Sequence, residues 1–387
     1  MQNFVFENPT KIIFGRGQIR KVGPETARYG KKVLLVYGGG SIKTNGIYDQ
    51  VLDSLNGAGI SVVEFSGVRS NPVLSHTREG IALAREENVD AVVAVGGGSV
   101  IDEAKTIAAG TKADHDVWDF FIGARVIKAA LPVLTVLTLS ASASEMNPAA
   151  VITNEEGAHK FSINSPFIRP KASILDPSAL FTVSPAYTAY SAVDIITHML
   201  EGYFNNEEPD SILQDRLVEG IMKTLMESTE AVLRDPEDYN GRAKMMWSAT
   251  IGFNGLTVAG MGRVMLPAHM IEHSLSALYD IAHGAGLSIV LPAWMSHTVQ
   301  AGPAKFARLA REVFGVTQPD DATAGRAGID HLKNWFASIG SPVSLAEANI
   351  PATDIGNIAA NAEELARVWR LNDYTREVIA DILDICR

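Results

Sequence analysis

The sequence predicts an α/β domain followed by an all-helical domain. Short runs of Val, Leu and Ile alternate with helix-like segments in the first half of the chain, a pattern typical of a parallel sheet covered by helices on both faces. Strand signals then stop, and long amphipathic segments fill the rest. We therefore place an α/β domain at residues 1–183 and a helical domain at residues 184–387.

The first half contains clear candidates for strands and for the helices that connect them. Thr10–Phe14 is predicted to be an extra strand or an arm of a hairpin. Four apolar runs are predicted to be buried strands: Lys31–Tyr37, Ile60–Phe65, Val89–Val95 and Leu131–Leu139. Helical spacing predicts helices at Ile47–Leu55, Leu74–Glu87 and Val100–Ala109.

The second half begins with a helix-start signal. Ser184 followed by Pro185 is the expected pair of an N-cap and a first helical residue. The helices predicted from apolar spacing are 186–204, 211–233, 241–256, 266–279, 286–299, 303–314, 323–338 and 359–384.

Composition excludes several classes of function. The chain of 387 residues has a formal net charge of −11 and no long basic run, so we expect no nucleic acid as partner. Cys386 is the only cysteine, which excludes disulfides within the chain and cysteine-ligated zinc. The first residues do not resemble a signal peptide and no apolar stretch is long enough to span a membrane, so we expect a cytoplasmic protein.

Two glycine-rich turns follow predicted strands. Gly96-Gly97-Gly98-Ser99 opens a helix, where glycines let the backbone approach a phosphate and the free N–H groups attract negative charge. The GxGxxG pattern of common dinucleotide sites is absent, and a tight turn without a ligand is the alternative.

The other turn, Gly38-Gly39-Gly40-Ser41, lacks the acidic residue that would bind a ribose 2′-hydroxyl. Its small residues, with Ser41 and the nearby Lys43, would leave room for a 2′-phosphate. If the ligand is a dinucleotide, this turn favours NADP(H), with NAD(H) as the alternative. A loop that contacts nothing explains the local sequence equally well.

A polar segment, Thr138–Glu145, ends the fourth predicted strand. Small polar side chains at the carboxyl end of a strand suit the crevice where open α/β sheets bind ligands. A plain serine-rich loop is the alternative.

Aspartate and histidines cluster within apolar sequence of the second half. Asp194 and His198 are four residues apart, as are His269 and His273, so each pair shares a helix face. His283 follows ten residues later. Burying such groups without partners costs several kcal/mol, whereas one carboxylate with imidazoles suits Zn²⁺ or Fe²⁺. The cluster therefore predicts a divalent metal site.

Taken together, these motifs resemble the iron-containing (group III) alcohol dehydrogenase family, over nearly the whole chain. Within it the sequence is most similar to the branch of butanol dehydrogenases and broad aldehyde reductases. The matching segments are Asn8–Gly15, Val36–Ser41, Gly96–Ser99, Leu175–Pro177, Asp194–His198 and Ala282–Gly286, with Pro292 after them. The resemblance implies a Rossmann-like N-terminal domain, an all-α metal-binding domain in a dehydroquinate synthase-like architecture, and a site in the cleft between them.

The resemblance also implies roles for individual residues. His273 matches a histidine near the metal and the nicotinamide that is usually not a ligand, and is a candidate proton relay. The implied metal ligands are Asp194, His198, His269 and His283. The implied coenzyme-binding residues are Gly97, Gly98 and Ser99 at the pyrophosphate, Thr138, Ser142, Asn147 and Lys160 around the nicotinamide and its ribose, and Gly38, Gly39 and Ser41 at the 2′-phosphate.

Two positions depart from the family pattern. Ala143 stands where the family usually has a glycine, so this loop is expected to follow a different path. Ser184 replaces a usual proline before the metal helix. His159 and Lys160 are expected in a loop, and His76, His115, His297 and His331 as isolated surface or capping residues.

The expected chemistry is hydride transfer between a nicotinamide and a short- to medium-chain primary alcohol or aldehyde, assisted by Fe²⁺ or Zn²⁺ as a Lewis acid. Phe253, Asn254, Leu256 and Met261 are guesses for the substrate pocket, and the family implies a homodimer. The alternatives are a glycerol dehydrogenase-like polyol enzyme, a dehydroquinate synthase-like lyase, a metal-dependent hydrolase and a non-catalytic metal-binding scaffold. The lyase is disfavoured because Arg263 is the only basic residue around the metal segments.

Overall fold

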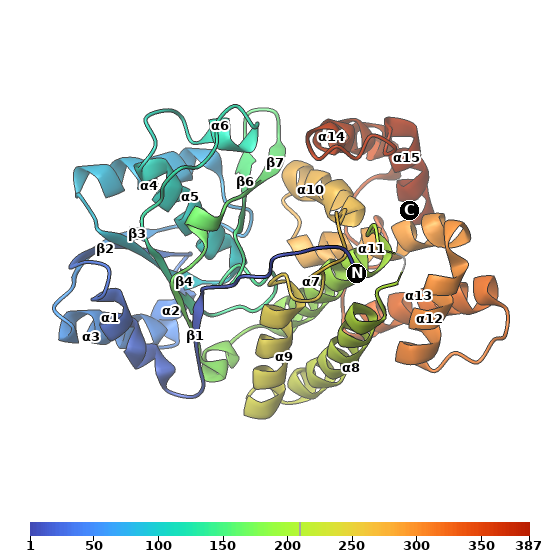
Figure 1. Ribbon diagram of the computed structural model, residues 1–387, viewed down its shortest axis with the longest axis horizontal. Coiled ribbons are helices and arrows are strands. Elements are labelled where there is room, and N and C mark those ends of the chain that lie inside the picture. The colour runs from blue at the N-terminus through green and yellow to red at the C-terminus, as the bar shows by residue number, and fades with distance from the viewer. Residues whose placement is uncertain (209) are drawn as a thin grey trace. The chain divides into compact units, whose positions relative to one another are not determined.

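The computed structural model describes residues 1–208 and 210–387 (Figure 1). Contacts divide the chain into two units. The sheet unit comprises Glu7–Val183 and Pro236–Thr250, and the helical unit comprises Met1–Phe6, Ser184–Asp235 and Ile251–Arg387. The change at Ser184 falls where strand character ends in the sequence. The predicted site in a cleft between the two domains stays a prediction.

A six-stranded parallel sheet forms the centre of the sheet unit, in the order β1-β8-β5-β4-β2-β3. The strands are β1 (Lys11–Phe14), β2 (Lys32–Tyr37), β3 (Ser61–Ser66), β4 (Ala91–Gly96), β5 (Val133–Leu137) and β8 (Ala172–Leu175). The helices are α1 (Val22–Thr26), α2 (Ser41–Thr44), α3 (Ile47–Gly57), α4 (Leu74–Glu86), α5 (Gly98–Thr111) and α6 (Trp118–Phe121). The predicted fold class is confirmed.

Helices cover both faces of this sheet, which explains why its strands are continuously apolar. Val33 and Leu35 on β2 belong to a buried cluster that includes residues of α3. The side chains of Leu34 and Val36 point to the opposite face of the sheet, because side chains alternate along a strand. They too are fully buried. Figure 1 shows α1 and α3 on one side of the sheet and α4 and α5 on the other.

The strand order places a topological switch point between β2 and β4. From β2 the chain moves outward to the edge strand β3, then returns to form β4 on the other side of β2. Tyr37 at the end of β2 pairs with Val95, and Gly96 at the end of β4 pairs with Leu137 of β5. Open α/β sheets bind ligands beyond the carboxyl ends of strands at such a point, and the three polar or glycine-rich segments of the sequence start there.

A two-stranded antiparallel hairpin, β6 (Ala149–Asn154) and β7 (His159–Asn164), was not predicted. The loop expected at His159 and Lys160 is therefore wrong, because both residues lie in β7. Alternation is weak in these strands, since buried and half-buried positions mix on both faces.

The helical unit contains no named strand among the residues the structure describes. Its helices are α7 (Pro185–Phe204), α8 (Ile212–Arg234), α10 (Pro267–Tyr279), α11 (His283–Thr298), α12 (Pro303–Phe314), α13 (Asp321–Ser338), α14 (Ile355–Val368) and α15 (Arg376–Ile385). Another helix, α9 (Tyr239–Gly252), runs from one unit into the other along the sequence. The predicted start of α7 is confirmed, because the Ser184 hydroxyl accepts a hydrogen bond from the Tyr187 amide with Pro185 in the first turn.

The single helix predicted at 359–384 is wrong. The structure has two helices there, α14 and α15, with Arg370 in the left-handed region at φ 57° between them. A second N-cap, in which Thr375 accepts from the Val378 amide, starts α15. A residue with positive φ cannot continue an α-helix, so the helix ends before Arg370. The apolar spacing continues across this break, which is why the sequence predicted one helix.

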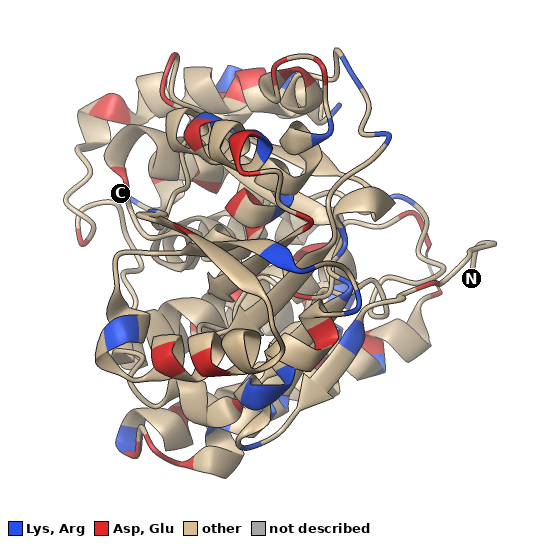
Figure 2. Cartoon of the chain, turned by 90° about the vertical axis from the view of Figure 1, so that its left-hand side faces the viewer, with Lys and Arg blue, Asp and Glu red and all other residues tan. Residues whose placement is uncertain are grey.

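Charges are interspersed along the chain. In the view of Figure 2, acidic and basic residues are scattered among uncharged ones, and no helix or loop drawn there carries a continuous basic stripe. None of the helices in the described part of the chain is both long and apolar enough to cross a membrane.

Candidate metal centre and coenzyme site

One face of α7 carries the first half of the candidate metal centre. Asp194, His198 and Glu201 lie at positions i, i+4 and i+7, which share a helix face. All three side chains are buried. The helix is buried almost all round from Thr188 to Tyr203, so these polar groups lie in an apolar interior and need partners.

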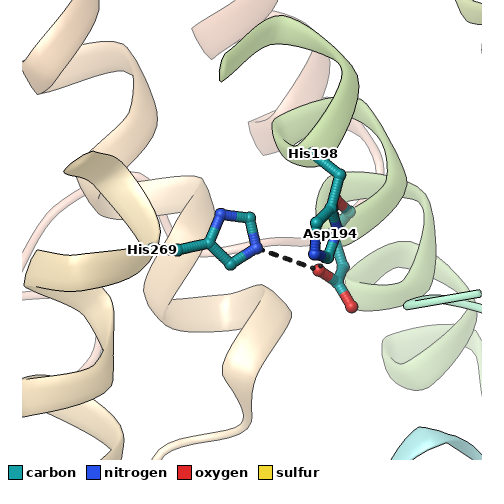
Figure 3. Close-up of side chains that lie close together, drawn as sticks. All are labelled: Asp194, His198 and His269. Atoms are coloured by element: carbon teal, nitrogen blue, oxygen red, sulfur yellow. Dashed lines mark hydrogen bonds and ion pairs between the residues drawn. The ribbon is translucent and has the colours of Figure 1, made fainter. Parts of the chain in front are cut away.

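Histidines of α10 and α11 complete the cluster. Ligand atoms of Asp194, His198 and His269 lie within 4.8 Å of one another (Figure 3). The Nε2 atom of His283 lies 3.8 Å from Oδ1 of Asp194, and its ring centroid is 5.2 Å from that of His269. The structure thus brings together all four predicted ligands, with His283 as the first residue of α11.

Two atoms at the centre of this cluster lack hydrogen bonds. Oδ1 of Asp194 and Nε2 of His269 are buried and have no hydrogen-bond partner among the described residues, although they lie 3.5 Å apart. Two ligand atoms each about 2.1 Å from one tetrahedral ion lie about 3.4 Å apart. The donor set and its spacing therefore fit a divalent cation.

The Nδ1 atoms of His269, His283 and His198 each lie against an acceptor oxygen. Glu201 Oε2 accepts a hydrogen bond from Nδ1 of His269, and Glu272 Oε2 accepts one from Nδ1 of His283. Nδ1 of His198 lies 2.9 Å from the carbonyl oxygen of Asp194. Metal-binding histidines usually use their second nitrogen in this way.

The pKa values of the cluster reflect these neighbours. Burial alone would raise the pKa of Asp194, but interactions with His198, His269 and His283 outweigh it and hold the pKa well below its usual range. Burial lowers the pKa of His269, whereas Glu201 and Asp194 raise it further, to about 9.

Aromatic rings lie beside the cluster. The ring centroids of Phe253 and His198 lie 3.9 Å apart. His273 is buried, 5.6 Å from the His283 ring, and meets Trp369 edge-on at 5.4 Å. Of the other pocket guesses, Leu256 is 40 % exposed and Met261 is buried. Trp369 was missed because a tryptophan between two helices gives no spacing signal.

The predicted pyrophosphate turn lies at the start of α5. Gly98 begins this helix, and a Cβ atom added to it would lie 2.4 Å from Oγ of Ser142. That Oγ is buried and has no hydrogen-bond partner among the described residues. Ser99 donates its hydroxyl hydrogen to the carbonyl of Ser70. The geometry leaves a backbone cradle with an unpaired hydroxyl, which fits a coenzyme phosphate or ribose.

The loop around Ser142 is fixed by a buried network. The Asn147 amide nitrogen donates to the Ser142 carbonyl at 2.9 Å, and its oxygen accepts from Lys105 Nζ at 3.2 Å. Lys105 also donates to Ser144 at 2.8 Å, and burial lowers its pKa to about 8. Asn147 therefore holds the loop, while Lys160 donates to Asn71 at 3.1 Å.

Ala143 lies in the same loop with φ 52°, in the left-handed region that glycine adopts most readily. An alanine at this position thus keeps a backbone conformation suited to glycine, and the replacement does not move this residue out of that region.

A carboxylate lies beside the lysine of the predicted 2′-phosphate turn. Lys43 lies 3.5 Å from Glu64, which also accepts hydrogen bonds from the hydroxyls of Tyr37 and Tyr48. These interactions hold the pKa of Glu64 below its usual range. The sequence did not reveal this carboxylate beside Lys43, because Lys43 lies in α2 and Glu64 in β3, and the contact is tertiary.

Comparison with known proteins identifies the family. Residues 9–177 match the family described as iron-containing alcohol dehydrogenase, and residues 188–386 match the C-terminal domain of the Fe-containing alcohol dehydrogenase family. The chain belongs to the iron-containing alcohol dehydrogenase family. The predicted family is confirmed.

Relatives in this family cover the whole chain. It is 43 % identical to the probable NADH-dependent butanol dehydrogenase 1 of Bacillus subtilis, over 99 % of each chain. It is 36 % identical to the NADPH-dependent aldehyde reductase YqhD of Escherichia coli, over 100 % of each. The crystal structure of NADH-dependent butanol dehydrogenase A from Thermotoga maritima has 47 % identity and a TM-score of 0.96, covering 100 % of this chain and 99 % of that one.

Sequence reasoning missed the two glutamates beside the candidate metal centre. Glu201 follows His198 by three residues and Glu272 follows His269 by three, so each lies on the same helix face as a predicted ligand. That spacing was the available signal. His76 was also misjudged as isolated, because it pairs with buried Glu103 at 2.6 Å.

Proposed function

We propose that Asp194, His198, His269 and His283 bind one divalent cation, Fe²⁺ or Zn²⁺. The observation that carries the proposal is a pair of buried atoms without a hydrogen-bond partner among the described residues, Oδ1 of Asp194 and Nε2 of His269. They lie among the side chains of His198 and His283. A bound cation would supply a Lewis acid that draws charge onto the substrate oxygen.

The chain then acts as an alcohol dehydrogenase and aldehyde reductase on short- to medium-chain primary alcohols or aldehydes. Family membership and relatives named butanol dehydrogenase and aldehyde reductase support this substrate class. The apolar rings of Phe253 and Trp369, beside His198 and His273, suit an aliphatic chain better than a sugar or polyol.

The hydride carrier is NAD(P)(H), bound at the carboxyl ends of β2, β4 and β5. The N–H groups at the start of α5 lack partners within the helix and would hold the pyrophosphate. We assign coenzyme contacts to Gly38, Gly39, Ser41, Gly97, Gly98, Ser99, Thr138, Ser142, Asn147 and Lys160.

The predicted preference for NADP(H) stays a prediction. Ser41 and Lys43 favour a 2′-phosphate, whereas Glu64 beside Lys43 opposes one. The relatives include enzymes named as NADH-dependent and as NADPH-dependent.

His273 is proposed to move the proton that the substrate oxygen gains or loses. The position of His273 supports this role, because the ring is buried and its centroid lies 5.6 Å from that of His283 and 5.4 Å from that of Trp369. A cytoplasmic location and a homodimer, both expected from the sequence, are part of the proposal.

A single assay tests this function. Protein loaded with Fe²⁺ or Zn²⁺ should oxidise NADPH or NADH in the presence of butanal, followed by the loss of nicotinamide absorbance. Asp194→Asn should abolish both metal binding and turnover. Absence of turnover with every coenzyme, aldehyde and metal combination, in protein that binds metal, would instead favour a hydrolase or a non-catalytic scaffold.

A further inference from the structure

Two buried glutamates lie behind the proposed metal ligands. Glu201 of α7 and Glu272 of α10 are both fully buried. One carboxylate oxygen of each accepts a hydrogen bond from the Nδ1 atom of a histidine, Glu201 from His269 and Glu272 from His283. Neither glutamate is among the four proposed ligands.

The contacts select one tautomer of each ring. An ionised carboxylate only accepts hydrogen bonds, so Nδ1 of His269 and of His283 must carry the hydrogen. In the neutral ring the Nε2 atom then holds the free lone pair that a cation needs. Both Nε2 atoms lie on the Asp194 side, at 3.5 Å and 3.8 Å from its Oδ1.

Glu201 is itself held by the backbone of α10. Its second oxygen accepts hydrogen bonds from the amides of Ala268 at 2.5 Å and His269 at 3.3 Å. These amides are in the first turn of α10, where helix N–H groups have no partner within the helix. Glu201 thus fixes the helix start and the ring of His269 together.

Glu272 depends on a close approach of α11. Its Oε1 accepts a hydrogen bond from Ser276, and a Cβ atom added to Gly286 would lie 2.6 Å from Oε1 and 2.7 Å from Cγ of Glu272. Any side chain at Gly286 would therefore displace this carboxylate. The glycine gives Glu272 the room to reach His283.

We propose that Glu201 and Glu272 are positioning residues that hold His269 and His283 in the tautomer and orientation required for metal binding, and that Gly286 maintains the clearance for Glu272. The proposal rests on the proposed metal site. With Asp194, the glutamates also place three carboxylates in a buried region, and a divalent cation offsets part of that charge.

The test measures metal affinity by competition between the full-length protein and a chromophoric chelator, with Zn²⁺ as the probe and metal counted per chain. We expect Glu201→Gln and Glu272→Gln to bind Zn²⁺ about 10- to 100-fold more weakly than wild type. Gly286→Ala should weaken binding similarly, although it changes neither a charge nor a ligand.

Matched controls separate this effect from general damage. Glu103→Gln alters another buried glutamate that is paired with a histidine, His76, in the sheet unit. Gly220→Ala adds a methyl group to an exposed helical glycine with no atom within 4 Å of the new Cβ. Both controls should bind Zn²⁺ with wild-type affinity.

The Glu272→Gln and Gly286→Ala changes should also be non-additive. If both act through the contact of Glu272 with His283, the double variant should bind little more weakly than either single variant. Wild-type affinity in folded Glu272→Gln and Gly286→Ala would overturn the proposal, even if Glu201→Gln fails to fold.

Stoichiometry distinguishes the remaining outcomes. Two ions per wild-type chain, one of them lost in Glu272→Gln, would make Glu272 a ligand together with His273 and His283 and would overturn its positioning role. A wild-type chain that binds no ion would instead contradict the proposed function itself.

Discussion

Oδ1 of Asp194 and Nε2 of His269 lie 3.5 Å apart in the interior of the helical unit, and neither makes a hydrogen bond among the described residues. An unsatisfied buried polar atom costs about 1–3 kcal/mol. The separation of these two atoms matches that of two ligands on one cation, so the proposed cation would supply the partner that both atoms lack.

Replacing His269 should remove metal and activity together. His269→Ala deletes a proposed ligand and leaves Glu201 and Asp194 buried without their shared partner. We expect the bound metal to be lost and turnover to fall at least about 100-fold, the effect of losing several kcal/mol of transition-state stabilisation. Metal analysis and coenzyme oxidation measure the two effects, with His331→Ala as control. An active, metal-free His269→Ala protein contradicts the ligand assignment.

Metal affinity should rise with pH up to about 9. The pKa of His269 in the metal-free chain is raised to about 9, so at neutral pH both ring nitrogens carry a proton, and the proton on Nε2 must leave before a cation binds. Below that pKa, affinity should fall about tenfold for each pH unit as protons compete. Chelator competition between pH 6.5 and 9 measures the slope. A constant affinity across this range would show that no ligand loses a proton on binding.

Ala143→Gly should stabilise the protein or leave its stability unchanged. The left-handed conformation of Ala143 costs about 1–2 kcal/mol for a residue with a Cβ atom, while glycine loses about 0.5–1 kcal/mol through the entropy of the unfolded chain. We expect a gain of up to about 1 kcal/mol in the free energy of unfolding in urea. Ala327→Gly, within helix α13, should lose about 1 kcal/mol by comparison. A loss at Ala143 as large as at Ala327 would contradict the strain argument.

Ser41→Asp should shift coenzyme selectivity toward NADH. A carboxylate at the start of α2 would repel a 2′-phosphate, and the ratio of kcat/KM for NADPH over NADH should fall roughly tenfold, equivalent to about 1.4 kcal/mol. Ser61→Asp, at the amino end of β3, is the control for added negative charge. Glu64→Gln should change the ratio in the opposite direction by releasing Lys43. An unchanged ratio in Ser41→Asp would exclude this turn from 2′-phosphate binding.

Much of the fold follows from local sequence signals. The strands β2, β4 and β5 are continuous apolar runs because both faces of the sheet are covered, and the Ser184–Pro185 pair starts α7 where predicted. The hairpin of β6 and β7 could not be predicted in the same way, because its strands mix buried and half-buried positions without a clear period. The break between α14 and α15 was hidden by apolar spacing that continues across it.

The candidate metal site shows a similar division. Spacing alone brought Asp194 and His198 to one helix face, but it could not place α10 and α11 so that His269 and His283 meet Asp194. The roles of Glu201 and Gly286 also depend on contacts between helices. Those contacts are tertiary, and no pattern along one segment encodes them.

The most direct test is to strip the protein of metal with a chelator and restore Fe²⁺ or Zn²⁺ stepwise, recording bound metal and butanal-dependent oxidation of NADPH or NADH in the same samples. The account predicts that both rise together and reach a plateau at one ion per chain, and that Asp194→Asn shows neither. Full turnover in the stripped protein, or undiminished binding by Asp194→Asn, would contradict it.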